Sequence, residues 1–173
     1  MPRKTKRRPE RLYGSVIGWE GWTFRILSTP EGVRFLDLGD RSFAALSEQL
    51  HARVLPDDTV NEAALDQLHD FLSGERQEFS VDLDLRGTPF QLDVWNALQR
   101  IPYGGTATYS DVSTMVARPR AFRAVGQALA ANPVPILVPC HRVVGIDGHL
   151  VGFGGGLPLK ERLLALEQGS LGL

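Results

Sequence analysis

The sequence predicts an α+β protein in two parts, a sheet with helices followed by a mostly helical region. Short alternating runs rich in β-branched and aromatic residues fill positions 13–38. Apolar residues then recur at helical spacing, and a Gly-Thr-Pro sequence at 87–89 separates them from a second region that contains two short helices. We therefore expect three segments: a basic tail (1–11), an N-terminal α/β domain (12–86) and a C-terminal domain (87–173).

The N-terminal part begins with three predicted strands, at 14–19, 22–27 and 33–38. Glycine-containing turns separate them, which is typical of an antiparallel meander. Apolar stripes then predict helices over 42–54 and 61–72. Residues 79–85 alternate cleanly between apolar and acidic side chains, so we expect a further strand there with its acidic residues facing water.

The C-terminal part begins with a helix that Thr88 caps and that carries Pro89 at its first position. Thr108 or Ser110 caps a short helix through Met115, and the next helix spans 121–131. Two short helices around a tight break are typical of a helix-turn-helix, although an ordinary helical hairpin within a core has the same appearance.

The end of the chain contains a predicted hairpin and a final helix. Asp147-Gly148 suits the tight turn of a hairpin over 143–151, and the helix covers 157–168. Between them lies Gly152-Phe153-Gly154-Gly155-Gly156, whose backbone allows close approach of a flat ligand on which Phe153 can stack. A flexible linker fits less well, because this stretch does not join two domains.

Composition excludes several classes of protein. The chain has no stretch of 18 or more apolar residues and no signal-like apolar segment after its basic start, so we expect a cytoplasmic protein without a membrane partner. Its single cysteine can form neither an internal disulfide nor a cysteine-rich zinc site, and we expect no metal. The net charge is −1, but the segment from Arg86 to Arg142 carries six arginines against two aspartates, which provides a local basic face for phosphates.

Cys140 lies in the reactive part of the sequence, Pro139-Cys140-His141-Arg142. A thiol attacks as the thiolate, so a base or a cation beside it favours reaction, and both follow Cys140 directly. Sequence neighbours do not prove a Cys–His hydrogen bond, and the tripeptide alone is equally compatible with a buried structural cysteine beside a core histidine.

Taken together, these residues resemble the O6-alkylguanine-DNA alkyltransferase family, whose members reverse DNA damage directly. About half of the chain carries the resemblance, in the family's order and spacing. The matching positions are Gly87-Thr88-Pro89-Phe90-Gln91, Val94-Trp95, Ile101-Pro102-Tyr103-Gly104, Tyr109, Arg123-Ala124-Val125-Gly126, Asn132-Pro133, Pro139 to Val143, Gly154 to Gly156, Lys160 and Glu167. The N-terminal part resembles a ribonuclease H-like domain in architecture alone.

The resemblance implies roles for individual residues. Cys140 would displace guanine from the alkyl carbon, His141 would act as a base through a water molecule, and Glu167 would orient the imidazole. Tyr109 would donate a hydrogen bond to the departing guanine, and Asn132 would fix the turn that holds the cysteine. For the substrate, backbone groups of Cys140, Val143 and Gly154 would bind the base, while Phe153 and Pro135 would help to set the width of the pocket.

The resemblance also implies a DNA-binding face. The nucleotide must leave the duplex to reach a buried thiol, and Arg123 would fill the gap from the second helix of a winged-helix-like helix-turn-helix in the minor groove. Small residues such as Ala124 and Gly126 would allow close approach to the DNA backbone, although tight packing inside the protein explains them equally well. The arginines at 118, 120 and 142 would add to the basic face.

Two departures from the family pattern stand out. Phe153 replaces a common tyrosine, so a hydroxyl is missing there while stacking remains. The turn Ala117-Arg118-Pro119 lacks the glycine that is common between the two helices, so its geometry is in question. Zinc-binding cysteines of some relatives are also absent.

These inferences lead to one main hypothesis. A monomer without a cofactor would take the alkyl group from O6-alkylguanine in double-stranded DNA, and each chain would react once. O4-alkylthymine is a second candidate substrate. The principal alternative is a sensor that binds alkyl lesions without transfer, although such relatives lack the cysteine. A cysteine hydrolase and a helix-turn-helix transcription factor are weaker alternatives, because neither uses the whole set of matching residues.

Overall fold

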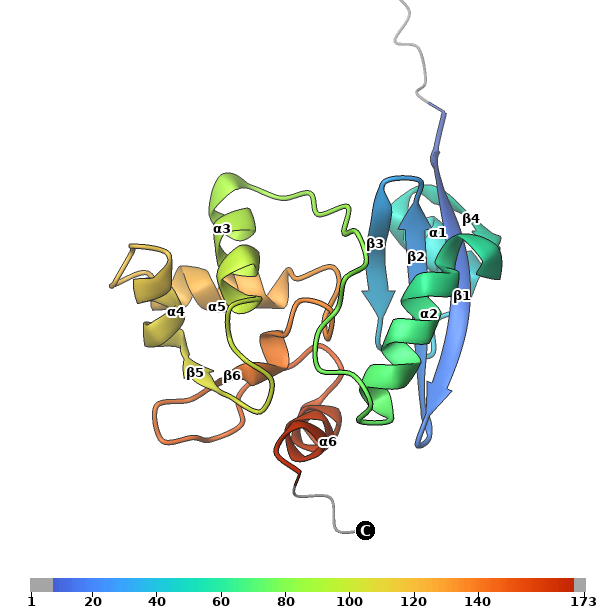
Figure 1. Ribbon diagram of the computed structural model, residues 1–173. Coiled ribbons are helices and arrows are strands. Elements are labelled where there is room, and N and C mark those ends of the chain that lie inside the picture. Colours follow the sequence, from blue (N-terminus) through green and yellow to red (C-terminus); the bar gives the residue numbers. More distant parts are fainter. Residues whose placement is uncertain (1–7, 170–173) are drawn as a thin grey trace, which may run out of the picture.

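The structure is a computed structural model that describes residues 8–169. The first residues of the expected basic tail, 1–7, lie outside this range. Figure 1 shows a sheet with two helices on one side of the molecule and the helices α3, α4 and α5 on the other, with α6 below both. The predicted α+β class is confirmed.

Four strands form the main sheet, in the order β3-β2-β1-β4. The strands β1 (Glu10–Trp19), β2 (Trp22–Thr29) and β3 (Gly32–Asp37) are antiparallel neighbours, as the meander predicts. Glu20 and Gly21 both have positive φ, 47° and 88°, which suits the two-residue turn between β1 and β2.

The helix predicted over 42–54 is wrong in its last four residues. Helix α1 (Phe43–Leu50) begins after the cap Ser42 and ends at His51, which is left-handed. Strand β4 (Ala52–Pro56) follows and pairs in parallel with β1. The helical spacing continued into this segment, but its backbone hydrogen bonds are made with a distant strand, which local periodicity does not reveal. Helix α2 (Asp58–Leu72) forms close to its predicted position, with Asp57 as its cap.

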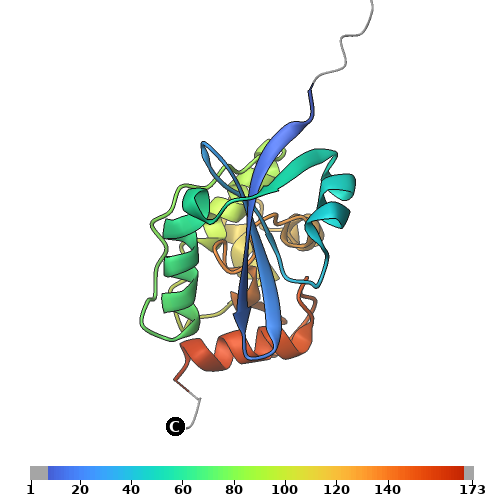
Figure 2. The ribbon, with the colours of Figure 1, turned by 90° about the vertical axis from the view of Figure 1, so that its right-hand side faces the viewer.

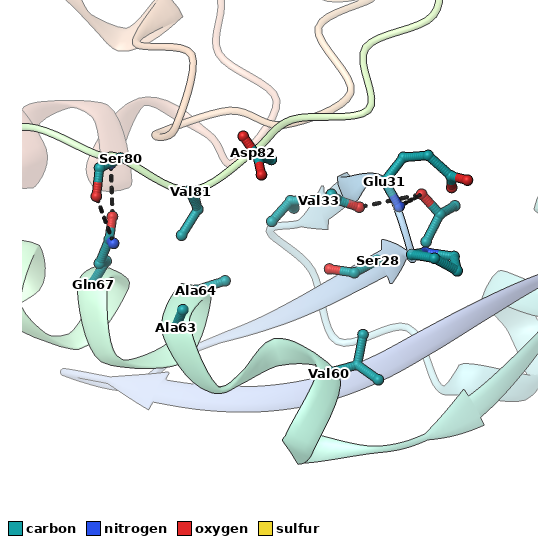
Figure 3. Close-up of a pocket in the computed structure, with 13 residues that line it drawn as sticks. Ser28, Glu31, Val33, Val60, Ala63, Ala64, Gln67, Ser80, Val81 and Asp82 are labelled. Atoms are coloured by element: carbon teal, nitrogen blue, oxygen red, sulfur yellow. Dashed lines mark hydrogen bonds between the residues drawn. The ribbon is translucent and has the colours of Figure 1, made fainter.

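The strand predicted over 79–85 is also wrong. This segment pairs with β3 at one bridge only, between Val33 and Leu83. At that point the backbone of Asp82 passes so close to Gly32 that a side chain at Gly32 would collide with it. Ser80 instead exchanges two hydrogen bonds with the amide of Gln67 on α2, of 2.8 and 2.9 Å (Figure 3). Along this segment Ser80 and Asp82 are exposed, while the apolar residues are partly buried against the core. Asp84 does not face water as expected, because its carboxylate accepts a hydrogen bond from Thr29 and its side chain is 11% exposed.

The C-terminal helices form where they are predicted. They are α3 (Pro89–Leu98), α4 (Tyr109–Met115), α5 (Phe122–Ala130) and α6 (Leu157–Glu167). Thr88 and Thr108 each complete a capping box with the residue three positions later. The predicted hairpin over 143–151 is reduced to a turn, closed by the Gly145 N–H to His149 carbonyl bond of 2.8 Å. Its first residues, β6 (Val143–Val144), pair in parallel with β5 (Ala107–Thr108) instead.

The sheet buries both of its faces. Leu27 faces a small cluster with Leu46 of α1, while the neighbouring Ile26 faces a large cluster that includes Leu68 of α2. The large cluster continues past residue 86 to Trp95 and other residues of the C-terminal helices. Seen from the sheet side, α6 crosses below the strands (Figure 2), and Arg162 of α6 pairs with Glu20 of the β1–β2 turn at 2.5 Å. One core therefore joins the two halves of the chain.

Candidate active site

Asn132 shapes the loop that carries the cysteine. Helix α5 ends at Ala130, and the Asn132 side chain then accepts a hydrogen bond from the Val134 N–H at 3.1 Å and donates one to the Val138 carbonyl at 2.9 Å. Within this loop Ile136 has a φ of +75°, a strained conformation for a β-branched residue. The loop delivers the chain to a single 3₁₀ turn, η1 (Cys140–Arg142), in which all three residues are buried.

The surroundings of the Cys140 thiol disfavour its ionisation in the absence of a base. The residue is 7% exposed, and burial raises the pKa of the thiol to about 11. The amide of Asn132 and the positive charge of Lys160 oppose this rise. At neutral pH the thiol therefore stays protonated, and nucleophilic attack requires a base to take its proton.

His141 and Glu167 form a buried pair, with 2.6 Å between Nε2 and Oε1. Arg142 also binds the Glu167 carboxylate through Nε at 2.8 Å, and it donates to the Ile101 carbonyl at 2.7 Å. The Gly104 N–H donates to Oε2 at 3.0 Å. Gly104 has a φ of +75°, and a Cβ there would lie 3.1 Å from the Glu167 carbonyl, so glycine suits this contact. The final helix thus delivers a fully hydrogen-bonded carboxylate to η1.

The charge states of this pair follow from its surroundings. Burial lowers the pKa of His141, so the imidazole is neutral near pH 7. Burial alone would raise the pKa of Glu167, but the hydrogen bonds and charges of His141 and Arg142 lower it overall. Because an ionised carboxylate only accepts hydrogen bonds, Nε2 of His141 must carry the proton and donate it. Nδ1 is then left with its lone pair, and it is buried without a protein partner in the described structure. His141 is therefore arranged as a base.

Lys160 belongs to this site although the sequence reasoning gave it no role. It is fully buried, and its Nζ donates to the carbonyls of Val143 at 2.6 Å and Val151 at 2.7 Å. Burial lowers the pKa of Lys160, and the nearby Cys140 thiol acts in the opposite direction. The signal was present, because Lys160 lies four and seven residues before Leu164 and Glu167 and so shares their inward face.

The predicted substrate-binding residues surround the thiol loop. Pro135 and Gly154 line one cavity of about 280 Å³ together with Asn132. The ring of Phe153 packs edge-on against His141, with 6.3 Å between ring centroids. Tyr109 is half-buried at the start of α4, and burial together with the Cys140 charge raises the pKa of its hydroxyl. The Val143 carbonyl, predicted to bind the base, already accepts from Lys160.

The residues predicted to bind DNA divide into two groups. Arg118, Arg120 and Arg123 are exposed around the start of α5, and Ala124 and Gly126 are half-buried in that helix.

Arg142 does not belong with them. Its side chain is 8% exposed and bound to Glu167. A phosphate contact does not fit that burial, and its part in the structure is to hold the carboxylate. This pairing could not be predicted from the sequence, because Arg142 and Glu167 lie 25 residues apart.

Other features of the described residues add no second site. The hollow in Figure 3, between β2, α2 and residues 80–82, is lined by none of the predicted site residues. Within residues 8–169 no cluster of three or more His, Cys, Asp or Glu side chains is arranged to hold a metal ion. No helix in this range is long and apolar enough to cross a membrane.

Comparison with known proteins places this chain in a family. The inducible methylated-DNA–protein-cysteine methyltransferase of Bacillus subtilis is 42% identical over 162 residues, which cover 91% of this chain and 90% of that protein. The chain belongs to the methylated-DNA–protein-cysteine methyltransferase family. The family model described as "6-O-methylguanine DNA methyltransferase, DNA binding domain" matches residues 89–169. The resemblance identified from the sequence is therefore confirmed.

Solved structures of this methyltransferase family agree in fold. The O6-methylguanine methyltransferase of Mycobacterium tuberculosis superposes with a TM-score of 0.80 at 37% identity, covering 91% of this chain and 93% of that one. The OGT protein of the same organism, solved in complex with DNA, gives a TM-score of 0.79 at 38% identity over 92% and 93% of the two chains. The agreement covers both halves of the chain, including the N-terminal sheet.

Proposed function

We propose that this chain repairs DNA by moving an alkyl group from O6 of guanine to Sγ of Cys140. The observation that carries the proposal is the buried thiol in the same 3₁₀ turn as a histidine whose Nε2 is engaged by an ionised glutamate. Similarity to a relative solved with DNA supports DNA as the partner. All of the proposed site residues come from one chain, so we propose that a monomer acts.

In the proposed reaction, Nδ1 of His141 takes the thiol proton through a bridging water molecule. The thiolate then attacks the alkyl carbon, the S–C bond forms as the C–O6 bond breaks, and guanine leaves with the electron pair. Tyr109 donates a hydrogen bond to the departing base, which neutralises charge as it develops. No cofactor takes part, because protein and DNA supply every atom that moves.

The imidazolium formed in this step lies against the Glu167 carboxylate. That contact stabilises it, as in other catalytic triads. The product is a thioether, and no group beside Cys140 can remove the alkyl again. We therefore propose that each chain reacts once.

A base inside a duplex cannot reach a residue that is 7% exposed. The lesion nucleotide must therefore rotate out of the helix, and Arg123 at the exposed start of α5 fills the space that it leaves. In this proposal α4 and α5 act as a helix-turn-helix in the minor groove, where little sequence is read. Arg118 and Arg120 bind phosphates beside it.

Transfer of a labelled methyl group tests the proposal. Duplex DNA with labelled O6-methylguanine should place the label on Cys140, while Cys140→Ala should bind the same DNA without acquiring label. A parallel duplex with O4-methylthymine tests the second candidate substrate. If the wild-type chain bound the lesion and left the label on DNA, the alternative of a lesion sensor would be correct.

A further inference from the structure

An exposed aromatic side chain lies beside Arg123. Phe122, the first residue of α5, is 49% exposed, and it belongs to neither of the two core clusters. About half of its surface is open to contact by a partner, and because single exposed apolar side chains are common, its role has to be judged from its surroundings. The sequence analysis assigned it no role.

The surroundings of Phe122 indicate the class of that partner. Three exposed arginines, Arg118, Arg120 and Arg123, lie within five positions of it in the sequence. In residues 8–169 none of the three forms an ion pair with an acidic side chain. An aromatic ring among unpaired cations matches a partner with anionic groups and flat apolar faces, and a nucleic acid has both.

The preceding turn fixes where the ring is presented. Ala117 turns the chain with a φ of +56°, and the Ala121 N–H donates to the Arg118 carbonyl at 2.8 Å before α5 begins. Val125, one turn further along α5, is fully buried and anchors the helix in the large core cluster. Phe122 therefore sits on a rigid element, where ordering it against a base has a small entropic cost.

We propose that Phe122 is a second wedge for opening the duplex, inserted beside Arg123 at the base step next to the lesion. Apolar side chains that enter the minor groove unstack a base step and bend the duplex. Arg123 would fill the place of the extruded nucleotide, and the Phe122 ring would stack on a base of the opened step. This inference rests on the proposed function and adds a positioning residue to it.

The test compares two substrates that differ in their need for base extrusion. Phe122→Ala should slow methyl transfer from a lesion duplex about tenfold, because stacking on a base is lost. Transfer from the free O6-alkylguanine base should stay at the wild-type rate. Phe122→Trp should restore the duplex rate, and Val16→Ala, which removes an exposed apolar side chain from β1, should change neither rate.

A fluorescent base analogue next to the lesion reports opening directly. Binding of the wild-type protein should raise the emission of the analogue as the base step unstacks. At saturating protein concentration, the Phe122→Ala variant should raise this emission less. Equal duplex rates and equal emission for Phe122→Ala and wild type would overturn the wedge. If both substrates slowed equally, the ring would act on the thiol site, and the wedge would also be wrong. If wild-type protein transferred nothing from either substrate, the proposed function itself would fail.

Discussion

At the scale of single residues, the proposed site contains a buried carboxylate that binds two side chains and one backbone N–H. Glu167 accepts from Nε2 of His141 and from Arg142, and it is 6% exposed. The proton on Nε2 leaves Nδ1 of His141 as the acceptor, and the thiol, whose pKa is about 11, needs such an acceptor. In the proposed reaction, the reactivity of Cys140 therefore depends on a residue 27 positions away in the sequence.

Glu167→Gln should damage both reactivity and stability. Loss of the negative charge removes the group that stabilises the imidazolium, so methyl transfer should slow by about 100-fold or more. Arg142 is left as an unpaired buried charge, which should cost about 3–5 kcal/mol of unfolding free energy. Rates would be measured at a temperature where circular dichroism shows the variant folded.

Glu161→Gln is the matched control, because Glu161 is exposed on the same helix. It should leave the transfer rate unchanged and alter stability by about 0.5 kcal/mol at most. A Glu167→Gln variant with the wild-type transfer rate would contradict the role of the carboxylate.

Acid should destabilise the folded protein through the same pair. Burial lowers the folded-state pKa of His141, so the unfolded chain binds more protons once the pH falls below the ordinary histidine value of 6.5. The pKa of Glu167 is also lowered, so its contribution is present above its ordinary value of 4.5 and is lost as the pH falls through its folded pKa.

The melting temperature should therefore fall as the pH falls from 7 to 5. His141→Gln removes the buried titrating imidazole. The melting temperature of this variant should therefore fall less over this pH range than that of the wild-type protein. Thermal melts across the range would measure both slopes. Equal slopes would show that His141 does not titrate as described.

At the scale of elements, the turn between α4 and α5 carries local strain. Ala117 is left-handed, with a φ of +56°. This conformation costs an alanine about 1–2 kcal/mol, while glycine adopts it freely. The family resemblance indicated that a glycine was missing here, and the structure shows that the backbone keeps the conformation that glycine favours.

Ala117→Gly should stabilise the protein by about 0.5–1 kcal/mol. This net value is the relief of strain less the greater backbone entropy of an unfolded glycine. Ala63→Gly, at an exposed position in the interior of α2, should instead destabilise it by about 0.5–1 kcal/mol. Urea denaturation would measure both, and a destabilising Ala117→Gly would contradict the assignment of strain to this turn.

The helices and strands differ in how well the sequence predicts them. Helices with clear caps, such as α3 after Thr88, were predicted closely because their signals are local. Strand β4 and the segment 79–85 were not, because their hydrogen bonds depend on distant partners, β1 and Gln67. In the site, the resemblance supplied roles for His141 and Glu167. The burial of Arg142 and Lys160 depends on the packing of α6 against η1, which composition and spacing do not reveal.

At the scale of the whole molecule, one core spans the two expected domains. The large cluster contains Phe24 and Ile26 of the sheet together with Trp95 and Val125 of the C-terminal helices. A backbone bond from the Leu36 N–H to the Pro133 carbonyl, at 2.8 Å, also joins the sheet to the cysteine loop. The N-terminal half therefore supports the loop that positions the thiol.

A shared core implies cooperative unfolding. Differential scanning calorimetry should show one transition, with the calorimetric enthalpy equal to the van't Hoff enthalpy. Two resolved transitions would indicate that the segments 12–86 and 87–173 are energetically separate, as independent domains would be.

We propose that the buried thiol keeps the alkyl group that it takes. Titration of the protein with an excess of duplex containing labelled O6-methylguanine tests this most directly. We predict a plateau of one methyl group per chain, all of it on Cys140, and no further repair on longer incubation. Repair of many lesions per chain, or a plateau with no label on Cys140, would contradict the account.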